Sequence, residues 1–533
     1  MQVVNDGRFP RCFSPTVRRA ILCALGVSLG ASGSASASTS GLGVSVHGNI
    51  LVDAQGKTLQ LRGVNYSGFE SVAVQGWDPS DPSGGAAGQT GGPRWSAVAA
   101  WDANVVRLPL NEDSWLGLTC TDTGNSTRSA DPGDNYQSSV ETQVEEANAA
   151  GIYVVLDLHW AAPGSSCPML QTQMADTDHS LTFWTSIANT FKNNPSVIFE
   201  LYNEPYFDSG FSGDQWAALL DGGTLTSYPA TGNSGVWEQI NTSWTSAGMQ
   251  QMLNAVRATG ATNVILTAGV SYNNDLSGWL THMPSDPLNQ LAASWHPYPP
   301  TQSVGTASVS AAGSGYAVGD TVTLAQPNTV YEPAVLTVSA ISSGGRITSV
   351  TVKSGGAYLQ TNLPTGAVAA ASTSGQGSGA SFALGNFTNE ASQWSMPSNW
   401  PAVQTIAAQV PVVITETGEH DTAGTVGSPF LAQLLPWCDA HGISYLGWTW
   451  DIWQNPDDVL ITDVGGDPTD GYGQYFQSHL RSAGSGQSAS GLSTPVPAIG
   501  RYAILLAVLL IASGWHARSR HASRGSNGRA SAR

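Results

Sequence analysis

The chain of 533 residues contains few charged residues, 11% in all, and basic residues are the scarcer kind. Residues 38–500 hold 10 of the 20 Lys and Arg but 37 of the 38 Asp and Glu. Binding to nucleic acid phosphates needs clustered Lys and Arg, so nucleic acid is not an expected partner. An uncharged ligand suits such an acidic surface, and the excess negative charge favours solubility.

Metal and nucleotide motifs are also missing. No cysteines are spaced as C-x-x-C, and no Cys/His cluster has the spacing of a metal site, so we expect neither a metal nor another cofactor. Cys438 lies in a helical pattern and is expected to be a buried free thiol. Cys120 and Cys167 lie in loops after predicted strands, which predicts a disulfide between them in an oxidising compartment.

The N-terminal residues 1–37 have the parts of an export signal. A basic region is followed by a mostly apolar stretch over 20–31 and by the small-residue cleavage site Ala35-Ser36-Ala37. The apolar stretch is too short to span a membrane comfortably, which argues against a permanent anchor. We therefore expect a secreted protein that is cleaved after Ala37.

The C-terminus has another three-part pattern over residues 495–533, preceded by a Gly/Ser-rich linker at 481–494. It consists of Pro495-Val-Pro497, a short apolar stretch from Tyr502 to Gly514 and an Arg-rich tail. This pattern resembles the C-terminal sorting signals that exosortase-like enzymes process in Gram-negative bacteria. The resemblance implies a location at the cell surface, with a sorting enzyme or the membrane as partner; an uncleaved membrane anchor is the alternative.

Short apolar runs, rich in β-branched and aromatic residues, recur along the chain with helical patterns between them. Near-continuous apolar runs are typical of parallel strands that are covered on both faces. Eight such runs predict an α/β fold, a (β/α)8 TIM barrel. A doubly wound open sheet is the alternative, but no Gly-rich phosphate loop follows the first run. The predicted strands are 61–66, 104–110, 153–160, 197–204, 263–270, 291–298, 412–416 and 444–450.

The predicted barrel is discontinuous, comprising residues 38–300 and 391–480. Residues 301–390 between them shift in composition to Gly, Ser, Thr, Ala and Val. Alternating apolar segments and a Ser-Ser-Gly-Gly sequence at 342–345 are typical of β-hairpins. We therefore predict a small all-β insertion after the sixth barrel strand.

Polar and aromatic side chains occupy the ends of most predicted strands, where TIM barrels place their active residues. Glu204 and Glu416 end strands four and seven, which lie on opposite sides of an eight-stranded barrel. Two facing carboxyl groups are what glycoside hydrolysis needs, one as acid and one as nucleophile or base. The other candidates are Arg107, His159, Asn203, His296, Tyr298 and Trp450.

The order of these motifs resembles glycoside hydrolase family 5, the cellulase family, over about residues 44–300 and 391–480. The matching segments are Leu61–Tyr66, Val106–Pro109, Leu156–Trp160, Leu201–Pro205, His296–Tyr298, Ile414–Gly418 and Trp448–Trp450. The resemblance implies retaining hydrolysis, with Glu204 as acid/base and Glu416 as nucleophile.

The resemblance also implies roles for the neighbouring residues. Arg107 and Tyr298 are expected to hold Glu416 ionised, as an opposite charge and a donated hydrogen bond do. Asn203 is expected to bind the sugar 2-hydroxyl, and Trp450 to stack on the sugar. The subsite beside the cleaved bond is expected to be lined by His159 and His296.

Several acidic and aromatic residues nearby have a second interpretation. Glu419 is the alternative nucleophile, whereas Asp157 and Glu200 are expected to be polar filler inside the barrel rather than catalytic groups. Other tryptophans near strand ends are expected to divide between sugar contact and packing. They are Trp115, Trp160, Trp295, Trp448 and Trp453.

The expected function is therefore that of a secreted, monomeric β-glycoside hydrolase acting on a polysaccharide. An endo-β-1,4-glucanase that cuts β-glucan is favoured. A β-mannanase or another β-glycanase is the alternative within the class. A non-catalytic glycan-binding surface protein is the alternative from another class.

Overall fold

The computed structural model describes residues 41–79, 94–122, 126–208, 210–226, 228–231, 237–240, 242–325, 330–360, 363–419, 428–452 and 459–484. The predicted export signal (1–37), the predicted sorting segment (495–533) and Trp453 lie outside these residues. In the part of the chain that is described, no helix has both the length and the apolar character to cross a membrane.

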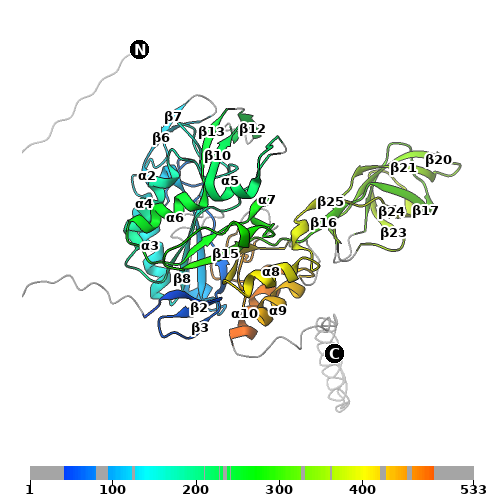
Figure 1. Ribbon diagram of the computed structural model, residues 1–533. Coiled ribbons are helices and arrows are strands. Elements are labelled where there is room, and N and C mark those ends of the chain that lie inside the picture. Colours follow the sequence, from blue (N-terminus) through cyan, green and yellow to red (C-terminus); the bar gives the residue numbers. More distant parts are fainter. Residues whose placement is uncertain are drawn as a thin grey trace, which may run out of the picture. The chain divides into compact units, whose positions relative to one another are not determined.

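Eight parallel strands close into a barrel, as predicted (Figure 1). Each strand pairs with the next barrel strand along the chain, and β27 pairs with β4 to close the ring. This is the (β/α)8 topology, in which the carboxyl ends of all strands open at one face. The strands are β4 (Arg62–Asn65), β5 (Val105–Asn111), β8 (Tyr153–Trp160), β9 (Val197–Glu200), β14 (Ile265–Thr267), β15 (Leu291–Trp295), β26 (Val412–Thr417) and β27 (Ser444–Gly447).

Helices lie around the barrel strands (Figure 1). Several have readable ends: Gly442, with φ 67°, follows α9 in the left-handed conformation that glycine favours. The helices are α1 (Trp95–Ala99), α2 (Glu112–Leu116), α3 (Tyr136–Ala149), α4 (Ser180–Phe191), α5 (Gln215–Asp221), α6 (Met249–Ala258), α7 (Val270–Asn273), α8 (Trp400–Ala407), α9 (Leu431–His441) and α10 (Tyr472–Gly484), with 3-10 turns η2 (Trp279–Thr281) and η4 (Gln393–Ser395).

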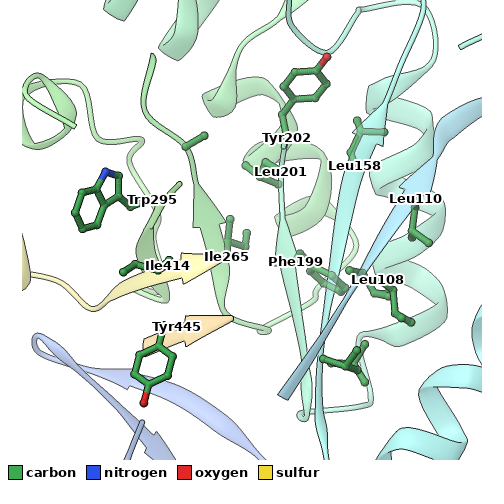
Figure 2. Close-up of a cluster of buried hydrophobic side chains, with 14 of the residues drawn as sticks. Leu108, Leu110, Leu158, Phe199, Leu201, Tyr202, Ile265, Trp295, Ile414 and Tyr445 are labelled. Atoms are coloured by element: carbon green, nitrogen blue, oxygen red, sulfur yellow. The ribbon is translucent and has the colours of Figure 1, made fainter. Parts of the chain in front are cut away.

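Two apolar clusters hold the barrel together. The larger one lies between the strands and the helices, and Figure 2 shows members such as Leu108, Leu158 and Phe199 projecting from the strands. The second joins inward-facing residues near the amino ends of the strands to the hairpin of β1 (Val44–His47) and β2 (Ile50–Asp53), beside β3 (Thr58–Leu59). Apolar packing therefore closes the amino end of the barrel, and the polar interior lies toward the carboxyl end.

Five barrel strands, β4, β9, β14, β15 and β27, end earlier than the sequence predicts. The fourth was predicted to reach Glu204, but β9 ends at Glu200. Beyond it, Leu201 N still donates to Leu266 O and Asn203 N to Leu158 O, so the chain stays extended between its neighbours without a regular ladder. His296 and Trp450 likewise follow β15 and β27 rather than ending them.

In the described residues between β15 and α8, ten antiparallel strands form sheets of four and six. Their own core includes Tyr316 and Tyr358, the last residues of two similar sequences, Gly313-Ser-Gly-Tyr316 and Gly355-Gly-Ala-Tyr358. Gly344 and Gly345 both have positive φ in the turn predicted at 342–345. The strands are β16 (Thr301–Ser303), β17 (Thr306–Ser314), β18 (Thr321–Leu324), β19 (Val330–Glu332), β20 (Val335–Ser342), β21 (Arg346–Ser354), β22 (Ala357–Leu359), β23 (Val368–Thr373), β24 (Ser378–Gly385) and β25 (Thr388–Ala391).

The insert leaves and rejoins the barrel at one place, because its first strand β16 pairs with its last strand β25. Long insertions cost little when their ends are held together. At the other end of the chain, the linker predicted from residue 481 starts later than expected. Helix α10 continues to Gly484, since Leu480 is buried and Arg481 donates to Ala100 O.

Further short hairpins lie in the loops between barrel elements. The pair β6 (Thr119–Thr121) and β7 (Thr127–Ser129) follows β5. The pairs β10 (Gly222–Leu225) with β13 (Trp244–Ala247), and β11 (Tyr228–Thr231) with β12 (Trp237–Ile240), follow α5.

Candidate active site

Arg107 lies at the centre of the polar interior, on β5, and its side chain is fully buried. Its guanidinium binds three carboxylates and two amide oxygens, which matches the rigid fork of five donors. The partners are Glu416 at 2.6 Å, Glu200 at 2.5 Å, Asp157 at 2.9 Å, Asn203 at 2.7 Å and Asn65 at 3.0 Å. Burial by itself lowers the pKa of Arg107, but the three carboxylates raise it above its ordinary value.

Glu416 is held on two sides. One carboxylate oxygen accepts from Arg107, and the other accepts from the hydroxyl of Tyr298 at 3.1 Å. These are the contacts that the sequence resemblance implied. Burial raises the pKa of Glu416 above its ordinary value, while His296 and Arg107 oppose that rise. Arg107 thus acts in the expected direction, but burial outweighs it.

Glu204 lies four residues beyond β9 and is the more accessible carboxyl, with its side chain 19% exposed against 6% for Glu416. Its Oε1 lies 2.9 Å from Nδ1 of His296. Burial raises the pKa of Glu204 to about 7, although Arg107 lowers it. Glu204 therefore holds a proton near neutral pH, as a general acid must.

His296 stands between the two glutamates. Its Nδ1 lies 3.8 Å from Glu416 Oε2, and oxygens of Glu204 and Glu416 lie within 4.8 Å of each other. Carboxyl groups about 5–5.5 Å apart are typical of retaining glycosidases, whereas inverting ones need a wider gap for a water. Burial lowers the pKa of His296 to about 4, so the imidazole is neutral at pH 7.

His159 and Asn203 lie next to each other, with Asn203 Nδ2 3.4 Å from His159 Nε2. His159 Nδ1 lies 2.7 Å from Asp157, and burial lowers the pKa of His159 to about 4. Asn203 accepts from Arg107, and its amide nitrogen lies 3.2 Å from Gln171 Oε1. Arg107 thereby orients Asn203 as well as Glu416.

Asp157 and Glu200 lie inside the barrel, as the strand parity indicated, and both are fully buried. Their role is more than filling space, because each forms an ion pair with Arg107. Removing one partner of a buried ion pair leaves an uncompensated charge and costs about 3–5 kcal/mol. They position Arg107, which in turn positions Glu416.

The expectation that Trp450 stacks on the sugar is wrong. Trp450 is only 2% exposed and packs edge-on against Trp101, with ring centroids 4.8 Å apart. Trp448, two residues earlier, is partly exposed and stacks on the ring of His159 at 5.7 Å and 8°. Trp448 therefore offers an aromatic surface beside the catalytic residues.

The remaining sequence candidates are structural in most cases. The carboxylate of Glu419, the alternative nucleophile, accepts the backbone N–H groups of Phe430 and Leu431 at the start of α9. Trp115 and Trp295 are buried, and Trp160 packs beside the disulfide. Capping and packing thus account for these four residues.

Several residues at the site were not predicted from the sequence. Thr415 Oγ1 lies 2.8 Å from His296 Nε2 and 2.7 Å from Glu200 Oε1, so it ties the histidine to the ion-pair network. Gln171 donates to the backbone oxygen of Glu204 at 2.5 Å. The alternation of β26 places Thr415 inside the barrel; no local signal marks Gln171.

A stacked pair of tyrosines lies next to Glu204. Tyr206 and Tyr272 have ring centroids 4.6 Å apart at 13°, and Tyr272 is 52% exposed. The backbone N–H of Tyr272 donates to Pro205 O, and Glu204 acts on the pKa of Tyr272, which burial raises. Exposed flat aromatics of this kind can cover sugar rings.

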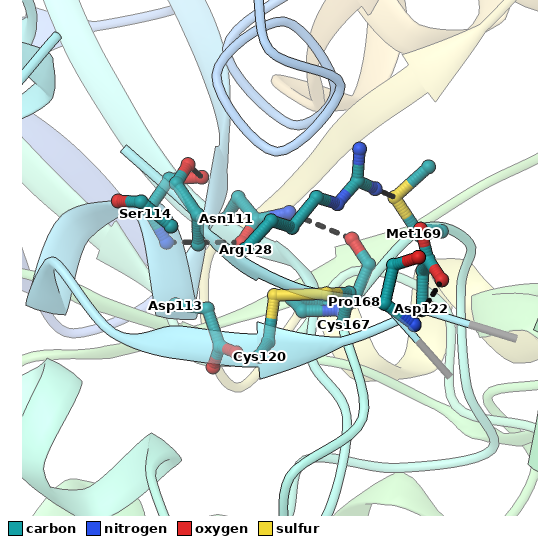
Figure 3. The surroundings of a disulfide bond; sticks show 12 residues. Asn111, Asp113, Ser114, Cys120, Asp122, Arg128, Cys167, Pro168 and Met169 are labelled. Carbon is teal, nitrogen blue, oxygen red and sulfur yellow. Dashed lines mark hydrogen bonds between the residues drawn. A yellow bond between two sulfur atoms is a disulfide. The ribbon is translucent and has the colours of Figure 1, made fainter. Parts of the chain in front are cut away.

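Cys120 in β6 and Cys167 in the loop after β8 form a disulfide with Cα atoms 4.8 Å apart. Figure 3 shows that Asn111 and Pro168 lie beside it, joined by a hydrogen bond of 2.8 Å. The disulfide fixes the loop after β5 to the loop that carries Gln171. Cys438 is a buried free thiol in α9.

Comparison with known proteins agrees with this arrangement. The family model for cellulase, glycosyl hydrolase family 5, matches residues 52–347, more than half of the chain. The chain belongs to glycosyl hydrolase family 5. Within this family-5 chain, Glu204 lies inside the matched range and Glu416 lies beyond it, on the far side of the insert.

Two known relatives are endoglucanases. One from Paenibacillus polymyxa is 25% identical over 267 residues, covering 48% of this chain and 59% of its own length. A manganese-dependent endoglucanase from Phanerodontia chrysosporium is 26% identical over 218 residues, covering 40% and 45%. This family-5 chain therefore spans about half the length of each. A solved β-glucanase from Saccharophagus degradans aligns with 84% of this chain and 94% of its own at 18% identity, with a TM-score of 0.46.

Proposed function

We propose that this family-5 protein is a retaining endo-β-1,4-glucanase that uses Glu204 as acid/base and Glu416 as nucleophile. The observation that carries the proposal is the facing pair of carboxyls, with oxygens within 4.8 Å of each other. The surroundings of the two carboxyls differ, as double displacement requires of a nucleophile and an acid/base. Glu416 contacts a cation and a hydroxyl donor, while Glu204 contacts a neutral imidazole.

In the first step, a Glu416 oxygen attacks the anomeric carbon while Glu204 gives its proton to the departing glycosidic oxygen. Arg107 and Tyr298 hold the Glu416 carboxylate in place for that attack. The pKa of about 7 keeps Glu204 protonated at mildly acidic pH. One part of the polysaccharide is now bound to Glu416 as a glycosyl ester. The other part, on the reducing-end side of the cleaved bond, is free.

In the second step, ionised Glu204 takes a proton from water, and the water oxygen attacks the anomeric carbon. The bond to Glu416 breaks, and the carboxylate returns to Arg107. Because both steps invert the same carbon, the product retains its configuration. Proton NMR of early products tests this: the β-anomer is expected first, and an initial α-anomer would refute the double displacement.

The proposed substrate is an uncharged β-glucan, bound as a polymer by a monomeric enzyme. The acidic composition and the aromatic surfaces of Trp448 and the Tyr206–Tyr272 pair support a neutral sugar chain. The known relatives are named endoglucanases, which supports the same choice. The test is the release of reducing ends from β-glucan, mannan and xylan. Faster release from mannan would favour a mannanase, and no release would favour a glycan-binding protein.

We further propose that the protein is exported and sorted to the cell surface of a Gram-negative bacterium. The three-part pattern of residues 1–37 and that of 495–533 support this proposal. Truncation before Ser493 is expected to release active enzyme into the medium. Equal retention of the truncated and full-length proteins on cells would contradict the sorting role.

A further inference from the structure

A second group of carboxylates lies between two loops on the catalytic face of the barrel, apart from the glutamates described above. Glu112 and Asp113 begin α2, directly after β5. Asp176 and His179 lie in the loop after β8, where His179 precedes the first residue of α4. The proposed hydrolysis uses none of these four residues.

These side chains converge on one point. Ligand atoms of Glu112, Asp113 and His179 lie within 4.8 Å of one another, and His179 Nδ1 is 3.4 Å from Asp113 Oδ1. The carboxyl of Asp176 lies against that of Glu112. Glu112 and Asp176 are fully buried, and Asp113 is 1% exposed. His179, with a side chain 20% exposed, leaves a way in from solvent.

The outer atoms of the group are tied down by the protein. Glu112 accepts from Ala162 N at 2.9 Å and from the hydroxyl of Ser180 at 2.6 Å. Asp176 Oδ1 accepts the backbone N–H groups of residues 178 and 179, both at 2.8 Å. These contacts orient the carboxylates toward the space between them.

The inner atoms of the group have no such partners. Among the described residues, none forms a hydrogen bond with Asp113 Oδ1, Asp176 Oδ2 or His179 Nδ1, although all three atoms are buried; Asp113 Oδ1 and His179 Nδ1 only face each other across 3.4 Å. Burying unpaired polar atoms is costly. An ion bound between the carboxylates would give these buried atoms a partner.

We propose that Glu112, Asp113, Asp176 and His179 bind one divalent transition-metal ion, such as Mn²⁺ or Zn²⁺. Carboxylate oxygens alone suit Ca²⁺ and Mg²⁺, but an imidazole nitrogen beside them favours a first-row transition metal. The catalytic trio of Glu204, His296 and Glu416 makes a poorer site. Its atoms already bind one another, Arg107 and Tyr298.

The ion would act as a structural link rather than a catalyst. It would join the loop after β5 to the loop after β8, the same two loops that the disulfide joins, and Figure 3 shows Asp113 near Cys120. The second loop carries Gln171, which holds the backbone of Glu204 and the amide of Asn203. Metal binding would therefore help to hold Glu204 in position without any contact between the ion and the reacting groups.

The first experiment uses the unaltered full-length protein. It is stripped with EDTA, dialysed against Mn²⁺ or Zn²⁺ and then against metal-free buffer, and its metal content is measured by mass spectrometry. One ion per chain is expected. The melting temperature is expected to rise on the order of 3 °C when free metal is about 100 times Kd. Failure to bind either ion, with no thermal shift, would overturn the proposal.

The second experiment locates the ion. Asp113→Asn and His179→Gln are expected to abolish metal retention and the thermal shift. Asp178→Asn is the matched control, because Asp178 is an exposed acid of the same loop that accepts from Gly164 N. Glu204→Gln controls for binding at the catalytic residues. Undiminished retention by Asp113→Asn, or loss in Glu204→Gln alone, would refute the assigned site.

Discussion

Replacing Glu204 by Gln removes the proposed proton donor and keeps the shape of the side chain. Its Oε1 lies 2.9 Å from the neutral imidazole of His296, which an amide can also contact, so the substitution is expected to leave the fold intact. Positioned proton transfer contributes about 10²–10⁴-fold to such reactions. Hydrolysis of the polymer should fall by that factor, or about 3–5 kcal/mol in activation free energy.

The fall should depend on the leaving group. A dinitrophenyl oligosaccharide releases a phenolate that needs no proton, so Glu204→Gln should cleave its bond at close to the normal first-step rate. Glu416→Gln should lose activity on both substrates. No carboxylate remains to attack, and Arg107 loses one of its buried partners. Initial rates and the burst of phenolate measure the two variants side by side.

The pH profile gives a second readout of the same role. With a pKa of about 7 for Glu204, kcat/KM of the unaltered enzyme on polymer should fall as pH rises through 7, since the protonated form is the active one. This decrease in kcat/KM above pH 7 should be absent when Glu204→Gln acts on the activated substrate. If Glu416→Gln instead spared the activated substrate, or the decrease persisted without Glu204, the assignment of roles would be wrong.

Four other variants test further parts of the structure. Cys120→Ser, which breaks the bond to Cys167 across 47 residues, should lower stability by about 4 kcal/mol, seen as a lower melting temperature that reductant no longer alters. Trp448→Ala should raise KM with little loss of stability. Trp450→Ala should lower the free energy of unfolding by about 3–5 kcal/mol, because its ring is buried. The reverse pattern would show that the sugar surface is misassigned. Ser303 and Thr388 pair across the base of the insert, so replacing 303–388 by a short link should leave cleavage of aryl oligosaccharides intact and slow cleavage of polymer; equal rates on both would show that the insert adds nothing to substrate binding.

Much of this architecture could be predicted from the sequence because its causes are local. Strands covered on both faces leave continuous apolar runs, so eight runs separated by helices identified the barrel. Glu204 and Glu416 were found because a barrel brings strand ends to one face. The turn at 342–345 was predicted because two glycines in sequence permit positive φ.

Other features depended on contacts between distant segments. Nothing local distinguishes Trp448 from Trp450, since the second ring is buried by residues distant in sequence, such as Trp101. The pKa of Glu204 depends on how deeply its carboxyl is buried, and burial is a property of the closed barrel. The spacing of Glu112 and Asp176 carries no metal motif, because their carboxyls meet only when the loops after β5 and β8 come together. Sequence by itself determined which residues lie at or just beyond the end of each strand; tertiary structure decided which of them face one another, because that depends on closure of the barrel and on how its loops pack.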